Sequence, residues 1–128
     1  IFRGVLEEFP GLTIGSMEAG ASWVPFFIER LDEEFNWRGA EEAPKVQRVP
    51  SEYFRNGRIY VCIEPEEALL STVMDFVGED WFMYASDYPH PDADFPESAH
   101  YLRGRTDLSE GQKEKLLRTN ALRLYGLE

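Results

Sequence analysis

The chain has 128 residues, a length that fits one domain with a modest hydrophobic core. It carries 24 acidic against 13 basic residues, and the net charge of −11 disfavours nucleic acid and anionic membranes as partners. Cys62 is the only cysteine, which excludes an internal disulfide, and no apolar run approaches the ~20 residues of a membrane span. With no signal peptide recognised, we expect a cytoplasmic chain.

The first 39 residues predict a helix end, a strand and a second helix. Residues 1–9 are typical of the last turns of a helix, so we expect the chain to be part of a longer polypeptide. Residues 12–18 predict a strand, and a helix follows with Ser22 as its N-cap and Gly39 just after its end.

The middle of the chain predicts a long polar connection, a strand and a third helix. One helical turn is expected after Pro50, within the connection of residues 40–57, and residues 58–63 predict a nearly continuous apolar strand. Residues 64–67 then predict a helix start, with Pro65 at the first position and acids facing the positive end of the helix dipole. The expected buried face of this helix consists of Leu69, Leu70, Val73, Phe76 and Val77.

Residues 81–85 form an uncharged run typical of a strand that is buried on both faces. Pro89 and Pro91 prevent the strand from continuing, so Asp87 and His90 are expected just beyond its carboxyl end. Loops at this end of parallel strands carry the ligand sites of α/β folds. The sequence therefore places its first candidate site here.

The remaining residues predict two helices. A short helix is expected within residues 95–103, and Ser109 with Gln112 has the spacing of a capping box that opens the last helix, which ends at Gly126. Strands that alternate with helices predict a parallel sheet in a single α/β domain, residues 1–128. Because three strands leave open edges, we expect an incomplete unit, either part of a barrel or an assembly that closes with other chains.

Four segments carry a resemblance to a known family: EAGASW at 18–23, PSEYF at 50–54, ASDYPHP at 85–91 and NALRLYGL at 120–127. Together they resemble the C-terminal part of the amidohydrolase-related family, metal-dependent (β/α)₈ TIM-barrel enzymes that include aminocarboxymuconate-semialdehyde decarboxylase-like proteins. The likeness covers nearly the whole chain but only about the last third of such a barrel. It implies that the three strands correspond to barrel strands six, seven and eight.

The resemblance also implies a metal site. Asp87 matches the aspartate that closes strand eight, which binds or faces a divalent metal, most often zinc, and handles protons. The histidines that the family supplies from strands one and five have no counterpart in this chain. Glu18 stands where many relatives carry a histidine at the end of strand six, and this departure puts the usual general-base assignment in doubt.

Each candidate residue also has a purely structural interpretation. Asp87 is either a metal-site carboxylate or a turn cap before proline, and Glu18 is either a catalytic partner of Asp87 or an acceptor for helix N-terminal N–H groups. Glu64 follows the second strand, where an acidic first helical turn explains it adequately. His90 either contacts substrate or metal or orients its loop, and Trp23 either walls a substrate pocket or belongs to the core.

Other kinds of site have little support. His100 is expected on a helix surface, and two histidines without a cysteine cluster do not make a self-sufficient metal set. The glycines do not follow the pattern of a phosphate-binding loop, which argues against a flavodoxin-like binding domain.

Two functional hypotheses follow. The first is a C-terminal portion of a metal-dependent hydrolase or decarboxylase (a lyase) that acts on a small carboxylated substrate, with Asp87 in the metal site. On its own, the chain should then bind metal weakly and be inactive. The alternative is a non-catalytic module that self-associates through open sheet edges. The first hypothesis requires pairing with the missing part of the barrel, and the second a homo-oligomer.

Overall fold

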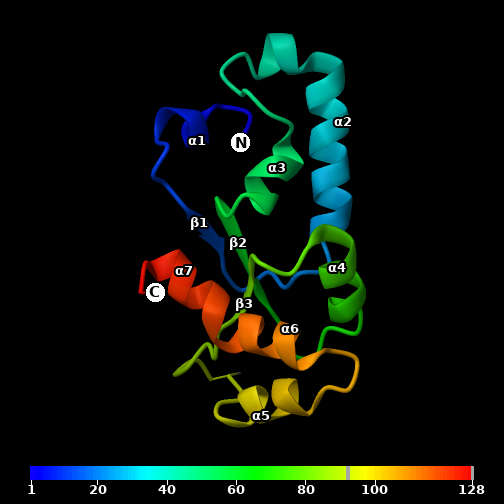
Figure 1. Cartoon of the computed structure of the whole chain (residues 1–128), viewed down its shortest axis with the longest axis vertical. Helices are drawn as coiled ribbons and strands as arrows, with labels where there is room; N and C mark the ends of the chain where they lie inside the picture. Colours follow the sequence, from blue (N-terminus) through cyan, green and yellow to red (C-terminus); the bar gives the residue numbers. More distant parts are fainter. Residues whose placement is uncertain (92, 128) are drawn as a thin grey trace.

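The computed structural model describes residues 1–91 and 93–127, and its centre is a sheet of three parallel strands. β1 (Ile14–Ser16) pairs with β2 (Ile59–Ile63), which pairs with β3 (Phe82–Tyr84), in the order β1-β2-β3 (Figure 1). Ser16 lies beside Val61, and Ile63 beside Tyr84. The predicted parallel α/β arrangement is confirmed, and the carboxyl ends of all three strands therefore meet at one edge of the sheet.

Helices flank this sheet on either side (Figure 1). They are α1 (Val5–Glu8), α2 (Val24–Glu42), α3 (Pro50–Arg55), α4 (Leu70–Val77), α5 (Glu97–Gly104), α6 (Glu110–Glu114), the π-helical turn η1 (Lys115–Thr119) and α7 (Asn120–Tyr125). The segment from α6 to α7 crosses in front of the strands in Figure 1, with α2 and α4 to their right. Within the described ranges, every helix is too short or too polar to cross a membrane.

The core surrounds β2 and β3. All five residues of β2 are buried, and the largest fully buried side chains include Trp81, Phe54 and Phe82. The Trp81 ring lies 5.2 Å from the ring of Phe54 and 4.4 Å from that of Phe82, measured between centroids. β1 differs, because Ile14 at its start is 39% exposed. The edge of the sheet formed by β1 is thus less covered than its centre.

Close packing explains the glycine in β1. A Cβ atom at Gly15 would lie 3.5 Å from both the Leu124 side chain of α7 and the Met83 side chain of β3. The C-terminal helix therefore packs directly onto the sheet at this point. Gly126 ends α7 in the left-handed conformation, at φ 63°, and Ser109 forms the predicted capping box with Gln112.

The predicted limits of the helix at residues 22–39 are wrong at both ends. Ser22 does not cap α2, because its backbone N–H and its hydroxyl both donate to the carboxylate of Glu67, at 2.8 and 2.7 Å. Gly39 lies inside the helix, which continues to Glu42. A Cβ atom there would meet the ring of Phe35 at 2.8 Å, so the glycine makes room for this ring instead of ending the helix.

The predicted helix start at residues 64–67 is also wrong, since α4 begins only at Leu70. Long-range hydrogen bonds hold this stretch as turns: the Arg105 guanidinium donates to the carbonyls of Pro65 and Glu67, at 2.7 and 2.8 Å. The buried face of the helix also differs from the prediction and consists of Leu70, Val73, Met74 and Val77. Leu69 and Phe76 are 57% and 61% exposed, contrary to the prediction.

Candidate functional site

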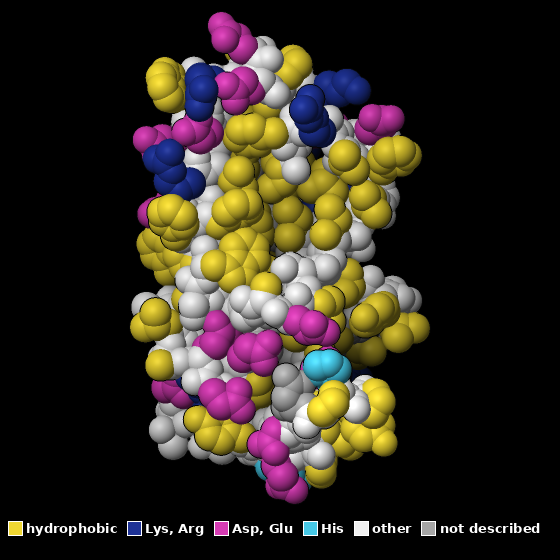
Figure 2. Space-filling view, turned by 180° about the vertical axis from the view of Figure 1, so that it is seen from behind, with side chains coloured by type: hydrophobic (Ala, Val, Ile, Leu, Met, Phe, Trp, Pro, Cys, Tyr) yellow, Lys and Arg dark blue, Asp and Glu magenta, His cyan; other side chains and the backbone are white. Residues whose placement is uncertain are grey.

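A cavity of about 480 Å³ lies at the carboxyl ends of the three strands. Figure 2 shows acidic side chains gathered on this part of the surface, with a histidine beside them. The structure brings together four of the predicted residues, Glu18, Glu64, Asp87 and His90, in the cavity wall. The other lining residues are Met17, Cys62, Pro65, Glu66, Ala85, Ser86, Ala93, Asp94 and Ser98.

Asp87 lies in the loop after β3 and adopts a left-handed backbone conformation, at φ 54°. Few residues other than glycine adopt it, although aspartate does so more readily than most. The Asp87 carbonyl accepts a hydrogen bond from the His90 N–H at 2.8 Å, and Asp87 Oδ2 lies 3.3 Å from His90 Nδ1. Both side chains remain well exposed, at 42% and 63%. Asp87 therefore shapes the turn through its backbone while its carboxylate remains accessible.

Glu18 follows β1 in the same unusual conformation, at φ 55°. A role similar to the alternative considered for Glu18, accepting N–H groups in the turn just before α2, belongs to Glu67. Both Ala21 and Ser22 donate their backbone N–H groups to the Glu67 carboxylate, at 2.8 Å. Glu18 itself is exposed in the cavity wall.

Glu64, after β2, lies in the cavity wall and not, as the sequence had suggested, in the first turn of a helix. Although Glu64 is exposed, partial desolvation of its carboxylate raises its pKa above the usual value, and the neighbouring carboxylates of Glu66, Glu67, Asp87 and Glu18 raise it further. No helix begins at this residue, so the helix dipole does not explain its position. Among the described residues that line the cavity there is no Lys or Arg. The strand ends therefore form an acidic rim, which we define as Glu18, Glu64, Glu66 and Asp87.

Cys62 forms part of the cavity wall beneath this rim. Its side chain is 4% exposed, and burial raises the pKa of the thiol. This confirms the prediction of a buried small hydrophobic residue.

The remaining predicted residues lie outside the cavity wall. The Trp23 indole N–H donates to the Gly20 carbonyl at 2.8 Å, and its ring packs edge-on against Phe27 at 5.2 Å. Trp23 thus braces the turn that follows Glu18. His100 is exposed on α5, as predicted.

Side chains of the cavity wall provide part of a metal-ligand set. Asp87 and His90 offer the carboxylate oxygen and imidazole nitrogen that divalent metals bind. Among the residues that the structure describes, no three His, Cys, Asp or Glu side chains converge to hold a metal ion. The residues present therefore match an incomplete ligand set.

Sequence patterns missed two residues that organise this site. Glu67 holds the turn after β1, and Arg105 holds the turn after β2. Local periodicity offers no signal for either, because both contacts join distant parts of the chain. The cluster of glutamates at 64–67 was the nearest hint, and it pointed to a helix start instead.

Comparison with known proteins identifies the family. Residues 1–127 match the family model described as amidohydrolase. The chain belongs to the amidohydrolase family. It is 31% identical to 2-amino-3-carboxymuconate-6-semialdehyde decarboxylase of Dictyostelium discoideum over 128 residues, which are all of this chain and 35% of that protein. The resemblance found in the sequence is thereby confirmed.

Solved structures show the same fold. The 5-carboxyvanillate decarboxylase of Sphingomonas paucimobilis superposes with a TM-score of 0.75 and 27% identity, over 99% of this chain and 37% of that one. A dihydroxybenzoic acid decarboxylase of Polaromonas, solved with manganese and the inhibitor 2-nitroresorcinol, gives a TM-score of 0.71 at 22% identity, over 98% and 37% of the two chains. The chain thus spans little more than a third of the length of these relatives.

Proposed function

We propose that residues 1–128 form the C-terminal portion of an amidohydrolase barrel, with β1, β2 and β3 as strands six, seven and eight. The three strands are parallel, in chain order and connected through helices, as successive units of such a barrel must be. The uncovered edge at β1 is then where the preceding strand pairs. Family membership favours this assignment over a non-catalytic module that associates with copies of itself.

We further propose that the acidic rim belongs to a divalent metal site, in which Asp87 is a ligand. The observation that carries this proposal is the group of carboxylates around one cavity, whose described lining residues include no Lys or Arg. A bound cation offsets the mutual repulsion of these carboxylates, which adds to desolvation in raising the pKa of Glu64. Zinc is the metal implied by the resemblance, and the manganese in the Polaromonas enzyme makes manganese the second candidate.

The bound metal would polarise a carboxylate or carbonyl oxygen of the substrate. Around it, the chain supplies groups that move protons: the Asp87 and Glu18 carboxylates both face the cavity and are accessible to solvent. His90 is placed to contact the substrate while holding the Asp87 carboxylate. Trp23 acts on substrate binding through the turn that it braces.

The proposed substrate is a small carboxylated compound, and decarboxylation is favoured over hydrolysis. Two relatives above 25% identity, the Dictyostelium and Sphingomonas enzymes, are named as decarboxylases, whereas a Mycobacterium avium relative at 26% identity is named only as an amidohydrolase. A metal also resolves a conflict within this proposal, because an anionic substrate would otherwise be repelled by the rim.

The test is metal dependence of the complete protein. Purified protein is treated with a chelator and assayed for CO₂ release from 5-carboxyvanillate and from 2-amino-3-carboxymuconate semialdehyde. We expect activity to disappear and to return with manganese or zinc. Activity that survives complete metal removal would refute the proposal.

The chain alone provides a second test. Because the described residues offer an incomplete ligand set, the 128-residue chain should bind zinc weakly and be inactive. Tight binding of one zinc ion per chain would show that the ligand set is complete without a further barrel portion. If the chain alone instead forms a catalytically silent oligomer that resists dilution, the alternative module gains support.

A further inference from the structure

The carboxylate of Glu67 accepts hydrogen bonds from the turns that follow two different strands. Its Oε1 accepts from the N–H groups of Ala21 and Ser22, both at 2.8 Å, and from the Ser22 hydroxyl at 2.7 Å. Its Oε2 accepts from Ala21 N–H at 2.9 Å and from Glu64 N–H at 3.1 Å. One side chain thus ties the turn after β1 to the turn after β2.

These two turns carry the glutamates of the acidic rim. Glu18 precedes the first bonded residue by only three positions, and the backbone N–H of Glu64 is itself one of the donors. Glu67 is not part of the cavity wall, whereas its neighbours Glu64 and Glu66 are. Its carboxylate is therefore directed to the turns and not to a ligand.

The backbone around Glu67 is held from the other side. Arg105, whose side chain is only 9% exposed, donates to the carbonyls of Pro65 and Glu67 and pairs with Asp107 at 2.6 Å. The same guanidinium lowers the pKa of Asp107 to about 2, so this ion pair persists across the neutral range. Glu67 thus projects from a fixed stretch of backbone.

The turn after β1 is built around this carboxylate. Gly20 has a left-handed backbone at φ 61°, and a Cβ atom there would lie 2.8 Å from Glu67 Oε1. Only glycine allows both the conformation and the close approach. The close approach of the Glu67 carboxylate to this turn therefore depends on the glycine at position 20.

We infer that Glu67 is a positioning residue, which sets the distance between Glu18 and Glu64 across the cavity. This inference rests on the proposed function for its catalytic consequence. Its structural part, the fixing of the Ala21–Ser22 turn by the Glu67 carboxylate, stands independently. The charge and both oxygens are required, because an amide in this position would turn an NH₂ group toward backbone N–H donors.

The structural part is tested by hydrogen exchange in the complete protein. In Glu67→Gln we expect protection at the amides of Ala21 and Ser22 to fall ~10-fold or more, while the strands keep theirs. Glu29→Gln is the matched control, since it removes an exposed charge from α2 and should leave these amides unchanged. Unchanged protection at residues 21 and 22 in Glu67→Gln would overturn the inference.

Kinetics test the catalytic part. Glu67→Gln should lower kcat for decarboxylation ~10- to 100-fold with little change in KM, because a misplacement of ~1 Å has such an effect. It should retain bound metal, whereas Asp87→Asn should lose it. Glu67→Asp keeps the charge on a shorter side chain and should recover part of the rate.

If Glu67→Gln does not fold, Ser22→Ala removes one donor alone and should lower kcat by a smaller factor.

The outcomes separate the two proposals. A wild-type kcat in folded Glu67→Gln, together with inactive Asp87→Asn, would overturn the positioning role and leave the proposed function intact. Full activity in Asp87→Asn would overturn the proposed function, and exchange at residues 21 and 22 would still decide whether Glu67 fixes the turn.

Discussion

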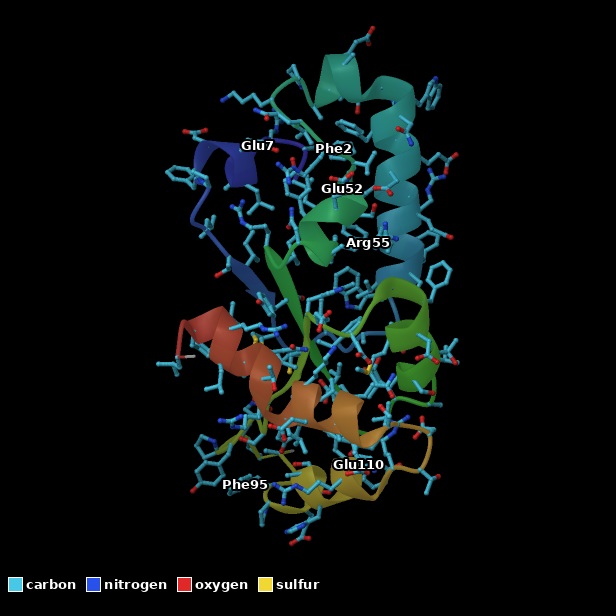
Figure 3. The ribbon with its side chains drawn as sticks, viewed as in Figure 1. Phe2, Glu7, Glu52, Arg55, Phe95 and Glu110 are labelled. Carbon is cyan, nitrogen blue, oxygen red and sulfur yellow. The ribbon has the colours of Figure 1, made fainter. Side chains whose placement is uncertain are left out.

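The two ends of the sheet differ in how their charged side chains are compensated. At the amino end, Arg58 donates to the carbonyls of Leu12, Phe9 and Leu6, at 2.8, 2.8 and 3.1 Å, and Glu7 accepts a hydrogen bond from the Tyr53 hydroxyl. Figure 3 shows Glu7 on α1, near α3 and far from Phe95 at the other end of the molecule. At the carboxyl end, the acidic rim surrounds a cavity, and the part of its wall that the structure describes contains no Lys or Arg.

This difference indicates that the amino end contributes to stability and the carboxyl end to function. Polar groups at the amino end have partners within the chain, and burial with the nearby Glu7 raises the pKa of Tyr53 to about 12. The carboxyl end keeps like charges together, which disfavours the folded state unless a cation or substrate compensates. In parallel barrels the carboxyl end carries the active site and the amino end contributes to stability. The charge arrangement of this chain follows the same division.

The largest effect is expected from Asp87→Asn in the complete protein. Loss of the carboxylate should reduce the rate of decarboxylation ~10³-fold, because one group serves as both metal ligand and proton carrier. In metal-free protein, the free energy of unfolding should stay the same or rise slightly, since a like charge leaves the rim. Steady-state kinetics and urea unfolding check the two parts, with Glu29→Gln as control. A large loss of stability in metal-free Asp87→Asn would contradict the claim that the carboxyl end serves function and the amino end stability.

The next effect is expected at the amino end, from Arg58→Ala. The variant loses three charge-assisted hydrogen bonds to carbonyl groups, so the free energy of unfolding should fall by ~2 kcal/mol. The kcat of the folded protein should remain within about twofold of the wild-type value, because this residue lies far from the cavity. Urea unfolding and kinetics on the same preparation measure both. A specific loss of kcat without destabilisation would contradict the comparison.

The smallest effect is a pair of opposite pH dependences at two glutamates. The Tyr53 hydroxyl lowers the pKa of Glu7 below 4.5, whereas partial desolvation and neighbouring carboxylates raise the pKa of Glu64 above it. Glu7 therefore stabilises the fold above pH 4.5 and loses this contribution as the pH falls through its lowered pKa. The contribution of Glu64 is complete below pH 4.5 and is lost as the pH rises through its raised pKa.

Urea unfolding of two variants between pH 3 and 7 measures these signs. At pH 7, Glu7→Gln should be less stable than the wild type, and Glu64→Gln should be equal or more stable by under ~0.5 kcal/mol, because solvent screens this exposed group. Both differences should shrink toward pH 3. The same sign for both variants at pH 7 would show that the two ends do not differ in charge compensation.

The sequence predicted well what depends on neighbouring residues. Uncharged runs indicated β2 and β3, the capping box at Ser109 began the last helical segment, and Gly126 ended it. These features are decided within a few positions of the chain. Parallel pairing then followed from the alternation of strands and helices, and it placed Glu18, Glu64 and Asp87 at one edge.

The failures of prediction around the site have a common physical cause in long-range polar contacts, whereas the wrong helix end at Gly39 reflects local packing against Phe35. Glu67 binds a turn 46 positions earlier, and Arg105 binds a turn 40 positions earlier, so neither contact leaves a local pattern. Both contacts hold residues 64–67 out of the helix that local preferences favour there. For the same reason Ser22 became a partner of Glu67 instead of a helix cap. The shape of the rim, as opposed to its position, could therefore not be predicted.

The most direct test of the account is to locate the metal in the complete protein. A crystal grown with manganese or zinc and measured at the absorption edge of the metal gives its position by anomalous scattering. We predict a peak in the cavity, ~2.0–2.3 Å from an oxygen of the Asp87 carboxylate. A fully occupied metal elsewhere, with the acidic rim making no contact to it, would contradict the account.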